Sequence, residues 1–253
     1  MFKLLTYMLP MFETLSLILI VTVAGFVQGL TGFGFGLIAL PLLGFFIPFK
    51  TIIPLVLLLG LIINATLSVQ LRKSVHLATI STLFLITLPG IPIGAYILKQ
   101  TSAEVLSIIL GIIMIAFTSY QLLAKPTQKV LGLPITLATG FTSGILAGSI
   151  GVGGPPVIIY SAIQPWSKNE VKGTLALYFL ISSLLAILSQ AYAGLITKEV
   201  IEYTLPAIPG LCLGIFCGIY AFKRISDNGY KKLAILLVFF LGWMMIAKNI
   251  FPL

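Results

Sequence analysis

The amino-acid sequence predicts an all-α protein that crosses a lipid bilayer many times. Hydrophobic residues make up 59% of the 253 residues and charged residues only 8%, whereas a soluble domain carries roughly 25% charged residues. The hydrophobic residues are gathered in long runs, and a membrane-spanning helix needs about 20 of them. Because no stretch is polar enough to form a separate soluble domain, we expect a single membrane domain over residues 1–253.

The first half of the chain contains five expected helical elements. The run at 11–30 is long enough to span a bilayer and continues into a stretch rich in glycine. The run at 33–49 is too short to span comfortably, and it ends at Lys50. Three further runs each close at one or two basic residues, and they cover residues 51–71, 75–98 and 105–124.

The second half contains five more expected elements in a similar order. A polar link leads to the run at 130–150, which is followed by a second short run at 152–166. We expect the polar residues 167–172 to form a loop. The last three expected elements cover residues 173–196, 203–222 and 233–250.

Short motifs recur in the two halves in the same order, which indicates an internal duplication. The matching motifs are Gly25-Phe26-x-x-Gly29 with Gly140-Phe141-x-x-Gly144, Gly34-x-Gly36 with Gly151-x-Gly153, and those around Pro89 and Gly94 with those around Pro206 and Gly218. We therefore expect one repeat at about 11–124 and a second at about 130–250. Duplicated halves with paired helix breaks are typical of secondary transporters.

The orientation of the repeats depends on the two short elements. If each is part of one long crossing, eight spans result, and the lysines and arginines divide seven against eight between the two sides. If each glycine-rich segment instead closes a helical hairpin that returns to its side of entry, the division is ten against five. Basic residues are enriched in cytoplasmic loops, so we prefer the hairpins, which also make the repeats inverted.

The glycine-rich segments are the strongest candidates for a binding site. In Gly151-Val152-Gly153-Gly154-Pro155-Pro156 the helix should end, because glycine weakens helices and proline cannot continue one. A broken helix at membrane depth exposes backbone N–H and C=O groups, and it is tolerated where it is buried or lines a watery cavity. Close helix packing is the alternative explanation for a glycine, and we expect it at Gly111, Gly132 and Gly242.

Such breaks offer a site for a small anion. The N–H groups that open a half-helix carry roughly half a positive charge, and we expect two openings, at residues 34–37 and 151–154, to face each other near mid-membrane. No lysine or arginine is expected deep in a span, so the backbone itself would hold the anion. Nearby hydroxyls of Thr142, Ser182 and Ser183 could add hydrogen bonds. The predicted substrate-binding residues are Gln28, Thr31, Gly32, Phe33, Gly34, Phe35, Gly36, Asn64, Ser143, Ser149, Gly151, Val152, Gly153, Gly154 and Pro155.

The sequence argues against an enzyme and against nucleotide or nucleic-acid binding. The glycine pattern that begins at Gly32 lacks both the spacing of a nucleotide-binding loop and a preceding strand. The carboxylates lie at or near the ends of spans, and the one histidine, His76, lies close to Arg72 and Lys73. No catalytic group, metal site or cofactor is therefore expected. The excess of 15 basic over 6 acidic residues is assigned to cytoplasmic loops.

Residues 25–41 and 144–156, together with Pro89 and Pro206, resemble the TauE/SafE family of sulfite and organosulfonate exporters over essentially the whole chain. The resemblance implies a multi-pass protein of the bacterial inner membrane that exports a small anion such as sulfite, thiosulfate or sulfoacetate. Its partners would be this anion and the lipid bilayer, and a homodimer is left open. Phe33 and Phe35 depart from the family pattern and suggest an anion with an apolar tail. The alternatives are a passive anion channel, a transporter of carboxylates or other organic anions, and a membrane assembly protein that transports nothing.

Overall fold

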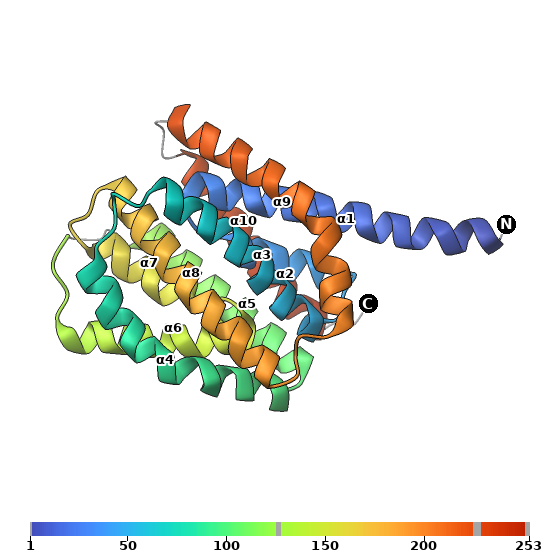
Figure 1. Ribbon diagram of the computed structural model, residues 1–253, viewed down its shortest axis with the longest axis horizontal. Coiled ribbons are helices and arrows are strands. Elements are labelled where there is room, and N and C mark those ends of the chain that lie inside the picture. The colour runs from blue at the N-terminus through green and yellow to red at the C-terminus, as the bar shows by residue number, and fades with distance from the viewer. Residues whose placement is uncertain (1, 125–127, 225–228, 251–253) are drawn as a thin grey trace.

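The computed structural model describes residues 2–124, 128–224 and 229–250, and this part of the chain folds into ten helices with no strand (Figure 1). The all-α class predicted from composition is therefore confirmed. In chain order the helices are α1 (Phe2–Thr31), α2 (Phe35–Leu43), α3 (Phe49–Gln70), α4 (Leu77–Gln100), α5 (Ala103–Leu123), α6 (Leu133–Ile150), α7 (Gly154–Ile163), α8 (Lys168–Tyr192), α9 (Lys198–Arg224) and α10 (Gly229–Ile250).

Every expected element contains a helix, but the expected loop at 167–172 is wrong. α8 begins there, because Ser167 and Glu170 form a capping box in which each side chain accepts the backbone N–H of the other residue. A serine followed three residues later by glutamate is a known signal for a helix start. A prediction of spans from hydrophobicity alone misses this helix start, because the segment contains several charged residues.

Eight of the described helices are long and apolar enough to cross a membrane, and α2 and α7 are not among them. These two helices have 9 and 10 residues, and at about 1.5 Å per residue neither spans a hydrocarbon layer about 30 Å thick. Large apolar side chains such as Leu213, Phe216 and Phe240 are exposed on the outer surface, as expected of side chains that face lipid. The chain is a multi-pass helical membrane protein.

Two pairs of helices pack with their backbones in contact and run parallel. Along α1 and α9, the backbone of Ile18 lies against Gly210, and that of Phe26 lies against Gly218. The absence of a side chain at glycine allows this close approach. α4 and α6 form the second parallel pair through Gly90, Gly94, Gly140, Gly144 and Gly148. The first helix of each half thus packs against a long helix of the other half.

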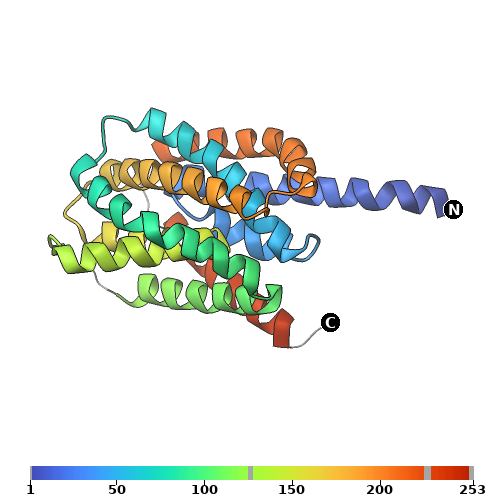
Figure 2. The same ribbon diagram turned by 60° about the horizontal axis from the view of Figure 1, so that its bottom comes forward.

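The first hairpin is formed by α1 and α2. α3 begins beside the start of α9, where the Thr51 hydroxyl donates a hydrogen bond to the Glu199 carboxylate at 3.3 Å. Because α1 runs parallel to α9, the end of α2 lies on the side of the bundle at which α1 enters (Figure 2). α1 and α2 therefore do not form one long crossing.

The second hairpin is formed by α6 and α7. The backbone N–H of Lys129, which precedes α6, donates to the carbonyl of Ile163 at the end of α7, at 2.9 Å. The end of α7 consequently lies beside the start of α6. Both short helices return to their side of entry, so the alternative of eight simple crossings is wrong. The duplication of the sequence remains a prediction.

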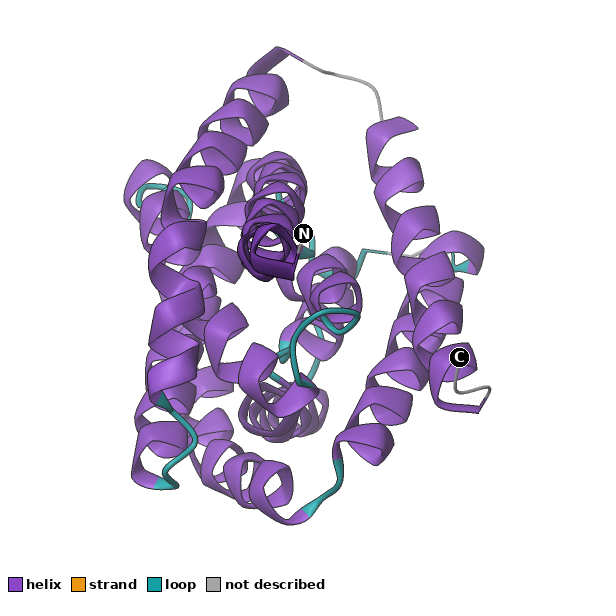
Figure 3. Cartoon of the chain, turned by 90° about the vertical axis from the view of Figure 1, so that its right-hand side faces the viewer, coloured by secondary structure: helices purple, strands orange, loops and turns teal. Residues whose placement is uncertain are grey.

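α5 and α10 pack against each other at Gly111 and Gly242, where a Cβ added to Gly111 would lie 2.8 Å from the Gly242 carbonyl oxygen. Seen along the helices, the N-terminal helix lies near the middle of the bundle and the C-terminal helix at its edge (Figure 3). The packing predicted for Gly132 is wrong, because the nearest atom to a Cβ there would be 3.8 Å away.

Candidate functional site

Both helix breaks begin where a helix ends in a left-handed glycine. α1 ends at Thr31 and is followed by Gly32 with φ of 88°, and α6 ends at Ile150 and is followed by Gly151 with φ of 70°. Residues other than glycine rarely adopt such angles. The two breaks are therefore equivalent at Gly32 and Gly151, whereas the motif spacing predicts that Gly34 matches Gly151. We call residues 32–34 turn 1 and residues 151–153 turn 2.

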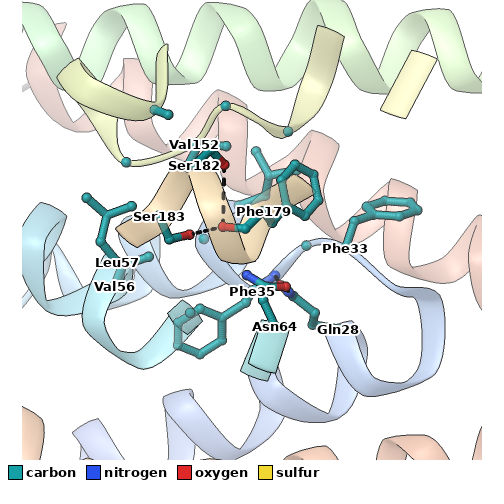
Figure 4. Close-up of a pocket in the computed structure, with 18 of the residues that line it drawn as sticks. Gln28, Phe33, Phe35, Val56, Leu57, Asn64, Val152, Phe179, Ser182 and Ser183 are labelled. Carbon is teal, nitrogen blue, oxygen red and sulfur yellow. Dashed lines mark hydrogen bonds between the residues drawn. The ribbon is translucent and has the colours of Figure 1, made fainter. Parts of the chain in front are cut away.

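A cavity of about 70 Å³ lies between the two turns (Figure 4). α2 and α7 both begin at it, and the middle parts of α3 and α8 complete its wall. Two half-helices thus open toward one space, although contact with a substrate remains a prediction for every residue. The lining residues that the sequence singled out are Gln28, Phe33, Gly34, Phe35, Gly36, Asn64, Gly151, Val152, Gly153, Gly154, Ser182 and Ser183.

The remaining predicted residues lie outside the lining of this cavity. Most of their side chains support the hairpins, since the hydroxyls of Thr31, Thr142 and Ser149 donate to carbonyls of their own helices. Gly32 faces Lys172 instead, because a Cβ there would lie 2.7 Å from the Lys172 Cγ. The residues outside the lining are Thr31, Gly32, Thr142, Ser143, Ser149 and Pro155.

A chain of hydrogen bonds beside turn 1 has a fixed direction. The backbone N–H of Phe35 donates to Gln28 Oε1 at 2.9 Å, and Gln28 Nε2 donates to Asn64 Oδ1 at 2.9 Å. Because a backbone N–H can only donate, both amides are oriented, and Asn64 Nδ2 remains as a donor at the cavity. In the described residues this Nδ2 and the N–H groups of Gly36 and Leu37 have no acceptor. Turn 1 therefore presents several free donors.

Turn 2 is held by hydroxyl groups behind it. The Ser143 hydroxyl donates to the carbonyl of Gly153, and the Tyr178 hydroxyl donates to Ser143 Oγ at 2.8 Å. α7 opens with Gly154, after which Pro155 and Pro156 carry no N–H. The first turn of α7 therefore carries fewer N–H groups than the first turn of α2, while those of Gly153 and Gly154 have no acceptor among the described residues.

One lysine is buried near the start of α8, where the sequence predicts a loop. Lys172 on α8 is 3% exposed, and its Nζ donates to the Gly29 carbonyl oxygen at 2.6 Å and lies 3.7 Å from the centroid of the Phe222 ring. A cation at the C-terminal end of a helix is stabilised by the helix dipole. On the same helix, Gln190 Nε2 donates to the Gly148 carbonyl oxygen at 3.0 Å. α8 thus holds the last turn of both α1 and α6.

Sequence reasoning missed much of the apolar wall of the cavity. Phe179 lies between the two turns (Figure 4), and its carbonyl oxygen accepts hydrogen bonds from the hydroxyls of Ser182 and Ser183. An apolar residue within a span carries no local signal that separates a cavity wall from a lipid-facing surface. The missed lining residues are Val56, Leu57, Gly60, Ala147, Ile158 and Phe179, whereas Leu37 falls in the predicted opening at residues 34–37.

A multi-pass helical bundle in which two broken helices open toward one internal cavity has the architecture of a membrane transporter. The family model described as "Sulfite exporter TauE/SafE" matches residues 17–245, and the chain belongs to this family. The chain is 27% identical over 198 residues to the "Probable sulfite/organosulfonate exporter TauE" of Cupriavidus necator, an alignment that covers 76% of this chain and 77% of the relative. No solved structure matches the chain significantly.

Proposed function

We propose that the protein is a secondary transporter that exports small sulfur-containing anions, such as sulfite or an organosulfonate, across the bacterial inner membrane. The observation that carries the proposal is the cavity between the two turns, whose lining in the described residues has free N–H donors and no acidic side chain. Membership of the TauE/SafE family supports the same substrate class. The chain would not be an enzyme.

Backbone and amide donors are suited to a tetrahedral or pyramidal oxyanion. The opening of α2 contributes the N–H groups of Gly36 and Leu37 together with Asn64 Nδ2, and roughly half a positive charge accumulates at a helix N-terminus. These dipoles act in a water-poor environment, where they are stronger than in bulk solvent. A negatively charged substrate would find attraction here and no like charge in the cavity lining.

The hairpins suggest how the site could open alternately to each side. Turn 1 belongs to a hairpin from one side of the bundle and turn 2 to a hairpin from the opposite side. Rocking of one half against the other around the cavity would expose the same anion first to one side and then to the other.

The distribution of basic residues supports an orientation. The start of α8 lies beside the start of α4, where His76 Nε2 and Glu170 Oε1 are 3.0 Å apart. This side carries most of the basic residues and would face the cytoplasm. Its described basic residues near the loops include Arg72, Lys73, Lys129, Lys168 and Arg224.

Flux measurements in proteoliposomes test the proposal. We expect purified protein to release preloaded labelled sulfite and ethanesulfonate, with a rate that saturates and with counterflow of labelled anion. Flux that neither saturates nor shows counterflow would favour the passive channel, and transport of carboxylates alone would shift the substrate class. Absence of flux with every sulfur oxyanion would support the assembly protein.

A pair of asparagine variants connects the flux to the cavity. Asn64→Leu removes the free Nδ2 donor and should lower the apparent affinity for ethanesulfonate by about tenfold, which corresponds to about 1.4 kcal/mol. Asn249→Leu is the matched control, since Asn249 Nδ2 donates to the Met245 carbonyl of its own helix, away from the cavity. Equal effects of both variants would contradict the proposed site.

A further inference from the structure

Every residue that lines the cavity in the described part of the chain is uncharged and carries no group that titrates near neutral pH. The cost of moving an ion from water into a low-dielectric interior rises with the square of its charge, so a dianion costs roughly four times as much as a monoanion of equal size. The attraction of fixed N–H dipoles rises only in proportion to the charge. A cavity built from neutral donors therefore discriminates against dianions.

The buried cation beside turn 1 does not change this balance. Lys172 Nζ lies against the Gly29 carbonyl oxygen and the Phe222 ring, and Lys172 is not part of the cavity lining. The partial negative charge at the C-terminal end of α1 offsets part of the positive charge of Lys172. Lys172 could therefore offset at most one negative charge on a ligand, which leaves the second charge of a dianion without compensation from it.

Other groups in the cavity wall are suited to the rest of a singly charged ligand. The rings of Phe33 and Phe179 offer apolar surface (Figure 4), as a short alkyl group would require. The hydroxyl hydrogens of Ser182 and Ser183 are directed to the Phe179 carbonyl. Their oxygens are consequently left as acceptors, which can bind the proton of a protonated oxyanion.

We infer that the cavity selects monoanions and excludes dianions of the same chemical family. Sulfite would be carried as hydrogen sulfite, and short alkylsulfonates would be carried at any physiological pH, whereas sulfate and doubly ionised sulfite would be excluded. This inference rests on the proposed function, because it assigns a charge state to the anion in that same cavity.

Binding measured by calorimetry at mildly acidic and mildly alkaline pH separates the charge states. Sulfite loses its second proton near neutral pH, so its apparent affinity should fall by about tenfold for each pH unit above that point. Ethanesulfonate, which has one charge throughout, should bind equally at both pH values, and sulfate should not compete with it. Sulfite affinity that is unchanged or higher at alkaline pH, or sulfate competing as well as ethanesulfonate, would overturn the inference and leave the proposed function standing. Binding of none of these anions would overturn both.

A cation placed in the cavity provides a second measurement. Gly60 lines the cavity on α3, and a Cβ added there meets no atom closer than Asn64 Nδ2 at 4.0 Å. Gly60→Lys should allow sulfate to compete with ethanesulfonate, whereas the neutral control Gly60→Gln should not. If both variants bind ethanesulfonate and both exclude sulfate, a missing cation is not the cause of the selectivity.

Discussion

The two turns are alike in sequence and differ in what their backbones are free to do. At turn 1, Gln28 reaches forward to bind one N–H of α2, and the N–H groups of Gly36 and Leu37 stay free beside the cavity. At turn 2, two prolines follow Gly154 and remove N–H groups, and Ser143 holds the Gly153 carbonyl. From this comparison we propose that turn 1 is the main binding element and that turn 2 mainly keeps a fixed shape.

The start of α2 also lies close to turn 2. A Cβ added at Gly36 would lie 2.9 Å from Cγ2 of Val152 and 3.9 Å from the carbonyl oxygen of Gly151. The two hairpins, which enter from opposite sides of the bundle, therefore lie close together at this point. The predictions below separate the binding role from the bracing role, beginning with the largest expected effect.

Leucine at the glycines of the turns should abolish transport in both cases, but for different reasons. Gly34 has φ of 106°, and a Cβ there would make only an ordinary contact, 3.5 Å from Val27 Cγ1. We therefore expect Gly34→Leu to strain the backbone at the cavity while the protein stays folded. A Cβ at Gly153 would lie 2.6 Å from the Ser143 carbonyl oxygen, so Gly153→Leu should also lower the melting temperature strongly. Counterflow and thermal unfolding measure the two effects.

The control for both variants is Gly132→Leu, which places a side chain where no atom lies closer than 3.8 Å to the Cβ. We expect it to transport normally. Unchanged transport kinetics in Gly34→Leu would count decisively against a binding site at turn 1.

Replacing the two glutamines that serve the turns should separate affinity from stability. Gln28→Leu leaves the Phe35 N–H and Asn64 without their partner, so we expect about tenfold weaker binding of ethanesulfonate. Gln190→Leu removes the bond to the Gly148 carbonyl and should lower stability with little change in affinity. Its cost is partly offset, since Gln190 Oε1 is buried without a partner among the described residues. The same affinity loss in both variants would remove the distinction between the turns.

Tyr178→Phe should destabilise the hydrogen bonds that hold turn 2, with a smaller effect than the glutamine variants. It removes the bond to Ser143 Oγ and the contact with Thr87 Oγ1, and the expected loss of stability is about 1 kcal/mol. Affinity should stay within about twofold, because the cavity keeps its donors. Tyr96→Phe is the control at an exposed tyrosine. A large loss of affinity in Tyr178→Phe alone would mean that turn 2 also binds the anion directly.

The positions of both breaks could be predicted from the sequence because they depend on local chemistry. Glycine at Gly32 and Gly151 and proline after Gly154 restrict the backbone wherever they occur. The same prolines also remove N–H groups, and this limits turn 2 as an anion site. That consequence is visible only when the residues are placed on the first turn of α7.

Contacts between distant segments could not be predicted in the same way. Gln28 and Asn64 were each candidates, but nothing in their separation of 36 residues indicates the bond between them. The sequence around Lys172 predicts a polar loop. In the structure the capping box at Ser167 starts a helix there, and the packing of this helix buries Lys172. Phe179 is one apolar residue among many, and its position in the cavity wall follows from helix packing alone.

The smallest effect is expected at the loop side of α8, far from the donors of turn 1. Glu170 is partly exposed, and its carboxylate both caps the helix and meets His76, which stacks on Trp166 with ring centroids 4.5 Å apart. Exposed ion pairs contribute little and weaken with salt, so Glu170→Gln should lower thermal stability slightly and leave ethanesulfonate affinity unchanged. Glu202→Gln, which removes the exposed pair with Lys198, is the matched control. If Glu170→Gln instead slows transport without changing affinity, the contact between Glu170 and His76 limits the movement of α8. The helix that contacts both α1 and α6 would then take part in transport without binding the anion.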